Sequence, residues 1–425
     1  MSDQPISKNP MRNVLSIRDF RLLFLGTTTS LLGDQLTLIA TPWLVLQLTG
    51  DPLVLGIVLA LEGIPRALFM LFGGALTDRF SPRIILLLSD LIRLLLATMM
   101  AVVVFTGTVQ IWMLYVFGLG FGLVAGFAVP AGNSILPMIV DEKDLEAGNS
   151  IVMGGGQLVG FVGPVVAGMV IGNFSESLFG VGLALSIDAA TYAVSALMLW
   201  LMRSGGTLSS LTNSNKESVW KSIRAGLEYV WDDKALRLMF LVIIAINFLF
   251  VGPILVGIPV LANQRLPEGA MAFGLLMSAF AGGNLGGYLL AGSVPKPTGK
   301  GMRILLTVLL ASFGVAMILM GFIHSTWIDF ALMLLLGIGN GYITIILFTW
   351  IQTRSPKTML GRIMSLVTLS SIGLVPISQA ISGAVSTWNL TLLFVSAGSL
   401  IVLMTSWTAF QPGLVAFSES LVMEN

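Results

Sequence analysis

The sequence has no cysteine, one histidine and few charged residues, and each shortage excludes a class of function. Without cysteine there is no disulfide bond, thiolate nucleophile or cysteine-ligated metal. The single histidine, His324, cannot build a histidine-rich metal site. Only 10% of the 425 residues are charged, whereas soluble domains average about 25%, so the chain could not cover its own surface in water. The net charge of +1 gives no reason to expect nucleic acid as a partner.

What the sequence has in excess is apolar surface: 56% of its residues are hydrophobic. A helix needs about 20 apolar residues to cross a bilayer, and twelve segments meet that rule. They cover roughly 22–47, 53–77, 84–107, 111–134, 147–172, 179–202, 236–262, 270–292, 303–323, 327–350, 360–386 and 389–410. We therefore predict an all-α integral membrane protein with twelve transmembrane helices, whose first span is retained and is not a signal peptide.

The distribution of basic residues predicts that both termini are cytoplasmic. With that orientation, every Lys and Arg except Arg66, Arg93 and Arg265 falls on the inner side or in the segments next to it. The predicted domains are a cytoplasmic segment (1–21), a six-helix bundle (22–202), a cytoplasmic linker with an amphipathic helix (203–235), a second six-helix bundle (236–410) and a cytoplasmic tail (411–425). We expect a monomer in the inner (plasma) membrane of a bacterium.

Short glycine-rich sequences recur in the two halves. FGLGFG at 117–122 is echoed by LGIGNG at 336–341, and LFGGAL at 71–76 by NLGGYL at 284–289. The two pairs are separated by nearly the same number of residues. Such internal duplication is typical of transporters, and it predicts two pseudo-symmetric bundles.

The loop after the second span contains Gly74-x-Leu76-x-Asp78-Arg79-x-Ser81-Pro82-Arg83. This stretch resembles the loop motif of the major facilitator superfamily, from which it departs at Ser81 and Pro82, and NSILPMIVDEKDLEAGNS (133–150) resembles the branch with macrolide and siderophore exporters. The resemblance implies the major facilitator fold and a cytoplasmic gate between the two halves. An alternative is that these charges only set topology. The expected gate residues are Gly74, Asp78, Arg79, Arg83 and, in the third span, Asp90 and Arg93.

A second motif, GGGQLVGFVGPVVAG at 154–168, lies in the fifth span. Gly156, Gly160, Gly163, Pro164 and Gly168 resemble the signature of drug:proton antiporters, which implies export. Small residues let helices approach closely and proline bends them, so ordinary helix packing is the alternative interpretation.

Acidic residues inside apolar runs are costly and usually face the bundle interior. Asp34 and the pair Glu62 and Arg66 fall near the middle of their spans and are our candidates for proton coupling. A structural hydrogen bond for Asp34 and a static ion pair for Glu62 with Arg66 are the alternatives. Asp188, alone in the sixth span, is interpreted as structural.

Polar residues at helical spacing in the first and eleventh spans, with polar and aromatic residues of the seventh and tenth, predict a central substrate cavity. They are Thr27, Ser30, Thr37, Thr41, Asn247, Phe248, Asn340, Tyr342, Thr368, Ser371 and Ser378.

These features favour a secondary transporter that exports amphipathic organic compounds by proton antiport. The sequence has no Walker-type phosphate loop, no catalytic residues and no metal-ligand group, so we expect no cofactor, with the proton gradient as energy source. The expected partners are the bilayer, protons and a small amphipathic substrate. A dedicated exporter of one metabolite, such as a siderophore, and a transporter of lysophospholipid or nutrient are the alternatives. A channel, an intramembrane enzyme and a receptor fit the sequence less well.

Overall fold

Each long apolar run forms a helix in the computed structural model, which describes residues 10–77, 80–174, 178–203, 219–295, 297–356 and 359–420. Within these residues, twelve helical segments are long and apolar enough to cross a membrane, and none of the described residues forms a strand. Their bounds agree with the predicted spans to within a few residues at most ends, so the prediction of an all-α membrane protein is confirmed.

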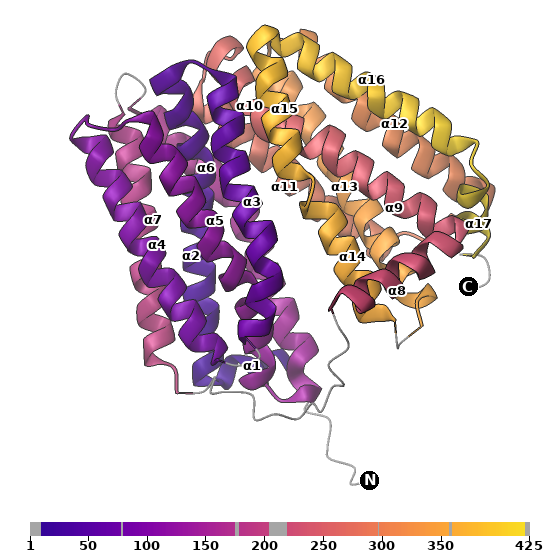
Figure 1. The fold of residues 1–425 in the computed structure, drawn as a ribbon, viewed down its shortest axis with the longest axis horizontal. Helices are drawn as coiled ribbons and strands as arrows, with labels where there is room; N and C mark the ends of the chain where they lie inside the picture. Colours follow the sequence, from indigo (N-terminus) through magenta and orange to yellow (C-terminus); the bar gives the residue numbers. More distant parts are fainter. Residues whose placement is uncertain are drawn as a thin grey trace. The chain divides into compact units, whose positions relative to one another are not determined.

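The first six spans are single helices, joined by short connections (Figure 1). They are α2 (Arg18–Thr49), α3 (Pro52–Thr77), α4 (Pro82–Phe105), α5 (Ile111–Ile135), α6 (Leu145–Gly172) and α7 (Phe179–Leu201). A short helix, α1 (Pro10–Ser16), precedes them, and the turns η1 (Leu136–Met138) and η2 (Glu142–Asp144) link α5 to α6.

Two of the last six spans are interrupted. The seventh consists of α9 (Lys234–Ile246), the π-helical turn η3 (Asn247–Val251) and α10 (Gly252–Arg265), and the eleventh of α14 (Leu360–Ile372) and α15 (Val375–Trp388). The others are α11 (Ala270–Ser293), α12 (Lys300–Phe322), α13 (Thr326–Arg354) and α16 (Leu390–Ala409). Two further helices, α8 (Val219–Asp232) and α17 (Pro412–Ser420), lie outside the spans.

Residues between the spans explain where the helices begin and end. Gly50 has φ 62°, a left-handed conformation that favours glycine, and it ends α2 immediately before Asp51 and Pro52 begin α3. Asp233 caps α9, because its side chain accepts hydrogen bonds from the backbone N–H groups of Ala235 (2.8 Å) and Leu236 (3.1 Å).

The chain forms two compact units, which differ from the predicted domains at one place. Unit 1 is Met1–Leu44 with Leu61–Asn213, and unit 2 is Val45–Ala60 with Ser214–Asn425. The segment 45–60 belongs to unit 2 because Gly56 approaches Gly383 of α15 so closely that a Cβ would lie 3.0 Å from its Cα, and because Gln47 donates a hydrogen bond to Asn263 (2.9 Å). Glycine at these two positions is what allows the contact.

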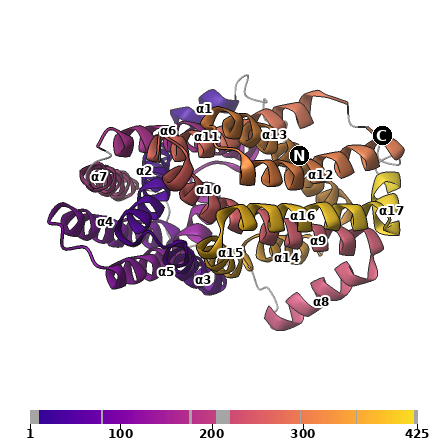
Figure 2. The same cartoon turned by 90° about the horizontal axis from the view of Figure 1, so that it is seen from above.

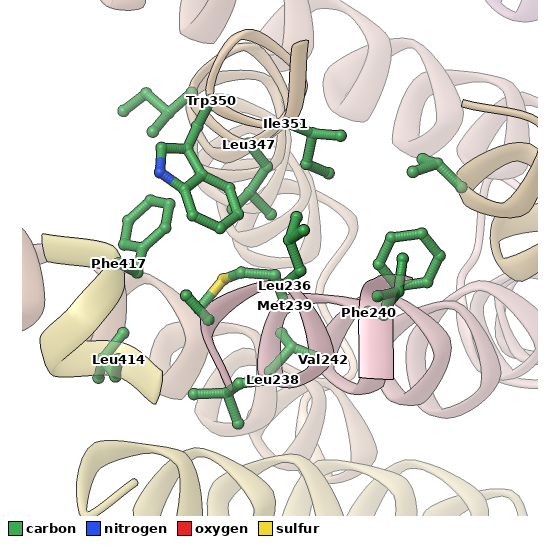
Figure 3. Packing of buried hydrophobic residues seen from close by; sticks show 14 of the residues in the cluster. Leu236, Leu238, Met239, Phe240, Val242, Leu347, Trp350, Ile351, Leu414 and Phe417 are labelled. Atoms are coloured by element: carbon green, nitrogen blue, oxygen red, sulfur yellow. The ribbon is translucent and has the colours of Figure 1, made fainter. Parts of the chain in front are cut away.

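The core of unit 2 includes the C-terminal helix α17 (Figure 3). Trp350 of α13 and Phe417 of α17 are fully buried and pack edge to face, with ring centroids 4.7 Å apart. Leu414 joins the same cluster, together with residues of α9. The segment predicted as a cytoplasmic tail therefore contains a helix that is part of the core of unit 2.

Replacing Phe417 by alanine is expected to lower the free energy of unfolding by about 3–5 kcal/mol, because the change leaves a cavity beside Trp350. Loss of tryptophan fluorescence on heating in detergent measures this change. Phe410→Ala is the matched control: that side chain is 87% exposed, so its removal should have little effect. Equal losses for the two variants would contradict the packing described here.

The predicted amphipathic helix is present as α8, at the margin of unit 2 beside α14 (Figures 1 and 2). Val230 is buried, and Gly226 packs against Leu366 of α14. Leu227 and Trp231 are about half exposed, as expected for a helix at a membrane surface. The side chains of Trp220, Ile223 and Lys221 lie outside the described part of the structure.

An ion pair between Asp233, just before the seventh span, and Arg354, at the end of the tenth, should make stability depend on pH. Arg354 donates from both Nε (3.0 Å) and Nη2 (2.7 Å) to Asp233 Oδ2. Burial alone would raise the pKa of Asp233, but hydrogen bonds from the Leu236 and Ala235 N–H groups and from Arg354 outweigh it and hold that pKa below its usual value.

A carboxyl group with a lowered pKa stabilises the folded state above its unfolded pKa of about 4, and this stabilisation is lost as the pH falls through the folded value. Wild type should therefore lose stability below about pH 4 more steeply than Asp233→Asn, in which the amide still caps α9. Thermal unfolding from pH 3 to pH 6 measures the two slopes. Parallel slopes would contradict a contribution from this carboxylate.

Candidate functional site

Two carboxylates of unit 1 are held between α2 and α7 in a reciprocal arrangement. Asp34 of α2 accepts a hydrogen bond from the Tyr192 hydroxyl of α7 (2.5 Å), and Asp188 of α7 accepts one from the Thr37 hydroxyl of α2 (2.5 Å). Each acid thus accepts a hydrogen bond from a neutral donor on the opposite helix. On each helix the acid and the donor are about one turn apart. Asp34 is half-buried, whereas Asp188 is fully buried.

The close approach of α2 and α7 depends on Gly33. A Cβ at this position would collide with Thr191 Oγ1 and Asp188 Oδ1. Thr191 in turn donates to its own helix at the carbonyl of Asp188 (2.7 Å), and its hydroxyl lies 3.4 Å from Asp188 Oδ1. The glycine beside Asp34 therefore makes room for the second carboxylate.

Arg93 of α4 is the cation shared by these acids. Its guanidinium lies over the Tyr192 ring, with Cζ 5.7 Å from the ring centroid. The same group interacts electrostatically with both Asp34 and Asp188. Its Nε is buried and has no hydrogen-bond partner among the described residues. The guanidinium is therefore not fixed by its Nε to any one carboxylate.

Asp90 and Arg93, predicted from the sequence as gate residues within the third span, lie well inside α4. They lie eight and eleven residues after Pro82, about 12 and 17 Å along α4 at 1.5 Å per residue. Asp90 is buried and interacts with Arg93 and with Ser195 of α7. Both residues thus belong to the interior cluster and are remote from the first turn of α4.

The remaining predicted coupling residues, Glu62 and Arg66 of α3, belong to the same cluster. Glu62 interacts electrostatically with Arg66, Asp34 and Arg93. Within the described part of the chain no direct ion pair joins Glu62 to Arg66, so the static pair considered above is absent. We call Asp34, Glu62, Arg66, Asp90, Arg93, Asp188 and Tyr192 the acid cluster; all seven residues lie in unit 1.

The acid cluster contains more acids than bases. Its four carboxyl groups face two guanidinium groups, so full ionisation would leave two negative charges without a counter-ion. Uncompensated charge is costly away from water, and carboxyl groups in such places bind protons instead. The arrangement can therefore hold protons and release them when water reaches it.

The predicted antiporter-like motif lies against α2 beside this cluster. Gly163 of α6 packs on Gln35, so closely that a Cβ would lie 2.6 Å from the Gln35 Cβ, and Gly156 and Gly160 face Leu31 and Gln35 across a wider gap. Pro164 and Gly168 are buried further along α6. The small residues of α6 thus act in packing against the helix that carries Asp34.

The structure describes only part of the predicted gate. Asp78 and Arg79 lie outside the described residues, and Gly74 is the fourth residue from the end of α3. Arg83 donates from Nε and Nη2 to the carbonyl oxygens of Leu199 and Trp200, each at 2.7 Å. It therefore satisfies the C-terminal carbonyl groups of α7 within unit 1.

Unit 2 contains a cavity of about 380 Å³, bordered by η3 and by α9 to α14. Three of the predicted residues, Asn247, Asn340 and Ser371, line it. Asn340 also donates a hydrogen bond to Asn284 Oδ1 on α11 (2.8 Å), a contact that the sequence did not predict. The other lining residues are mainly apolar or aromatic, among them Phe250, Phe280, Phe313 and Phe348, together with Tyr288 and Thr344.

Several residues predicted for the cavity lie elsewhere. Ser378 is buried and donates a hydrogen bond to the Phe248 carbonyl at η3, where π-helical bonding alters the backbone pattern. Thr368 bonds to the Met364 carbonyl (3.0 Å), and Tyr342 packs beside the core of unit 2. Thr27, Ser30 and Thr41 are half-buried on α2, whereas Thr37 is bonded to Asp188.

Twelve hydrophobic helices, a repeated six-span organisation and an interior acid cluster define a polytopic membrane transporter. The family model of the Major Facilitator Superfamily matches residues 23–377, and the chain belongs to this superfamily of transporters. Membership of a transporter family, and not of an enzyme family, agrees with the absence of catalytic motifs from the sequence.

Among curated relatives, the multidrug efflux pump Tap of Mycolicibacterium fortuitum is 25% identical over 368 residues, which cover 85% of this chain and 88% of that protein. Macrolide efflux protein A of Streptococcus pyogenes is 22% identical over 352 residues, covering 82% and 84% of the two chains.

Solved structures give the same fold. The nucleoside transporter NupG superposes with a TM-score of 0.71 at 12% identity, covering 94% of this chain and 99% of that one. An inward-facing bacterial homologue of the human lysosomal transporter Spinster gives 0.65 at 15% identity, covering 99% of both chains. At these identities the likeness establishes the fold alone.

Proposed function

We propose that this protein exports small amphipathic organic molecules in exchange for protons, by alternating access, across a bacterial plasma membrane with both termini inside. The observation that carries the proposal is the acid cluster, whose carboxyl groups outnumber its arginines by two inside the membrane-spanning part of unit 1. Asp34 is the assigned proton carrier, because it is less buried than Asp188 and faces both Glu62 and Arg93. The efflux pumps named above support the direction of transport.

The cavity of unit 2 supports the choice of substrate. Its lining contains no Lys, Arg, Asp or Glu, and its polar atoms are amide and hydroxyl groups. Apolar walls with a few convergent polar groups are typical of sites for organic ligands. A lysophospholipid headgroup or a strongly anionic siderophore would find no counter-charge in this lining, so the cavity favours a drug-like or macrolide-like molecule over those alternatives.

Export is tested in bacteria that lack their own efflux pumps. Cells expressing the protein should accumulate less ethidium and less labelled erythromycin than cells with an empty vector, and a protonophore should abolish the difference. A cell line expressing Asp34→Asn, which is expected to lose proton-driven export, at equal level controls for the burden of a membrane protein. Unchanged accumulation of every compound in a panel of cations, macrolides and siderophores would contradict export, and movement of a single siderophore would establish the dedicated exporter instead.

A further inference from the structure

Asp188 was interpreted from the sequence as structural, but its environment matches that of Asp34. It accepts a hydrogen bond from the Thr37 hydroxyl, as Asp34 does from the Tyr192 hydroxyl. Both donors are neutral, so neither hydrogen bond supplies the positive charge that an ionised carboxylate needs away from water. The two carboxyl groups are thus held by the same pair of helices in equivalent ways.

The charged groups that interact with Asp188 come from two other helices. They are Asp34 on α2 and Arg93 on α4, and Glu62 of α3 interacts electrostatically with both of these and with Arg66. Asp90 of α4 is a third acid that faces Arg93. Arg93 thus interacts electrostatically with three carboxyl groups of the acid cluster, Asp34, Asp90 and Asp188, whereas Arg66 interacts with Glu62.

One guanidinium cannot neutralise three ionised carboxylates at once. No ion pair joins Arg93 to Asp34, Asp90 or Asp188 in the described part of the chain, although Arg93 interacts electrostatically with all three. The Nε of Arg93 is buried and has no hydrogen-bond partner among the described residues, so it donates to none of these carboxylates. Asp188, which is fully buried and hydrogen-bonded to a neutral hydroxyl, then has no counter-ion of its own and must be neutral while the site is closed to water.

We infer that Asp188 is a second proton-carrying group, which loads and releases a proton in the same transport cycle as Asp34. On release each proton passes from a carboxyl oxygen to water, leaving a carboxylate that Arg93 stabilises; loading is the reverse. Thr37 positions Asp188 for this role, as Tyr192 positions Asp34. The inference rests on the proposed proton antiport and adds to it the number of protons exchanged.

The ratio of protons to substrate tests this assignment. Purified protein in liposomes would exchange labelled erythromycin against protons recorded by an internal pH dye. Asp188→Asn should lower the protons moved per erythromycin about twofold, because one of two carriers is lost. Asp329→Asn should leave the ratio unchanged: Asp329 is fully buried in α13 of unit 2 and outside the acid cluster.

An unchanged ratio in Asp188→Asn, or an equal fall in Asp329→Asn, would overturn the assignment of Asp188. A wild-type ratio of zero would overturn the proposed antiport itself, so the two failures are distinguishable. If Asp188→Asn does not fold, Thr37→Val provides a second test, because this variant retains both Asp34 and Asp188. Without the hydroxyl donor, its pH profile of transport should move toward higher pH at an unchanged ratio, and an unmoved profile would also overturn the inference.

Discussion

Asp34→Asn is expected to lose proton-driven export by about tenfold or more while still exchanging substrate for substrate. An asparagine oxygen can accept the Tyr192 hydrogen bond as the carboxylate does, so packing between α2 and α7 should survive. The amide cannot take up or release a proton, so it resembles a carboxyl group that is permanently protonated. Steps that require proton release from Asp34 should be slowed, and steps that require only substrate should continue.

Two assays on the same liposomes separate these steps. Uptake of labelled erythromycin driven by a pH gradient reports the proton-coupled step, and counterflow of labelled against unlabelled erythromycin reports exchange. Glu228→Gln is the control, since that carboxylate is exposed on α8 and paired with Arg224. Wild-type gradient-driven uptake in Asp34→Asn would show that Asp34 does not carry the coupling proton.

Gly33→Val should have the second largest effect, on stability as well as on transport. Its Cβ would collide with the side chains of Thr191 and Asp188, so α2 and α7 must separate or both side chains must move. Such overpacking typically costs about 1–3 kcal/mol, and it displaces both carboxylates of the reciprocal pair. We expect a lower unfolding temperature and coupled transport reduced to background.

Gly132→Val is the matched control on α5, where a Cβ would meet no described atom within 4 Å. It adds the same β-branched side chain to a transmembrane helix without touching the acid cluster. Both variants would be compared by thermal unfolding in detergent and by erythromycin uptake. Equal behaviour of the two would contradict the claim that α2 and α7 approach closely at Gly33.

The spans could be predicted because hydrophobic length is a local property of the sequence. The interruptions could not: η3 and the break between α14 and α15 depend on contacts such as the hydrogen bond from Ser378 to the Phe248 carbonyl, which joins residues 130 positions apart. The position of residues 45–60 in unit 2 likewise depends on the meeting of Gly56 with Gly383. Neither contact leaves a periodic signal in the chain.

Part of the site was visible in the sequence for the same reason. An acidic residue within an apolar run can be recognised from the sequence alone, and so Asp34 and Glu62 were chosen as candidates for proton coupling. Tyr192 was missed because its partner Asp34 is 158 residues away, and a tyrosine in a membrane helix is ordinary. Arg93 was placed at the gate because it follows the loop motif closely, although its side chain lies over Tyr192.

Asp188 shows the limit of judging a residue by its own span. On α7 its one neighbouring hydroxyl partner is Thr191, and only the close packing at Gly33 brings Thr37 of α2 beside it. The sequence did contain one clue, since Asp34 and Thr37 lie on the same face of α2. That this face of α2 packs against α7 follows from the tertiary structure and cannot be seen in the sequence.

The central claim is that substrate leaves in exchange for protons, and one measurement tests it most directly. Wild-type protein would be reconstituted in liposomes loaded with erythromycin and a pH-sensitive dye, then diluted into erythromycin-free buffer at the same pH. The account predicts that outward movement of erythromycin acidifies the interior. Liposomes that contain erythromycin and the dye but no protein should show no such change. Erythromycin efflux through the protein with no change of internal pH would contradict it.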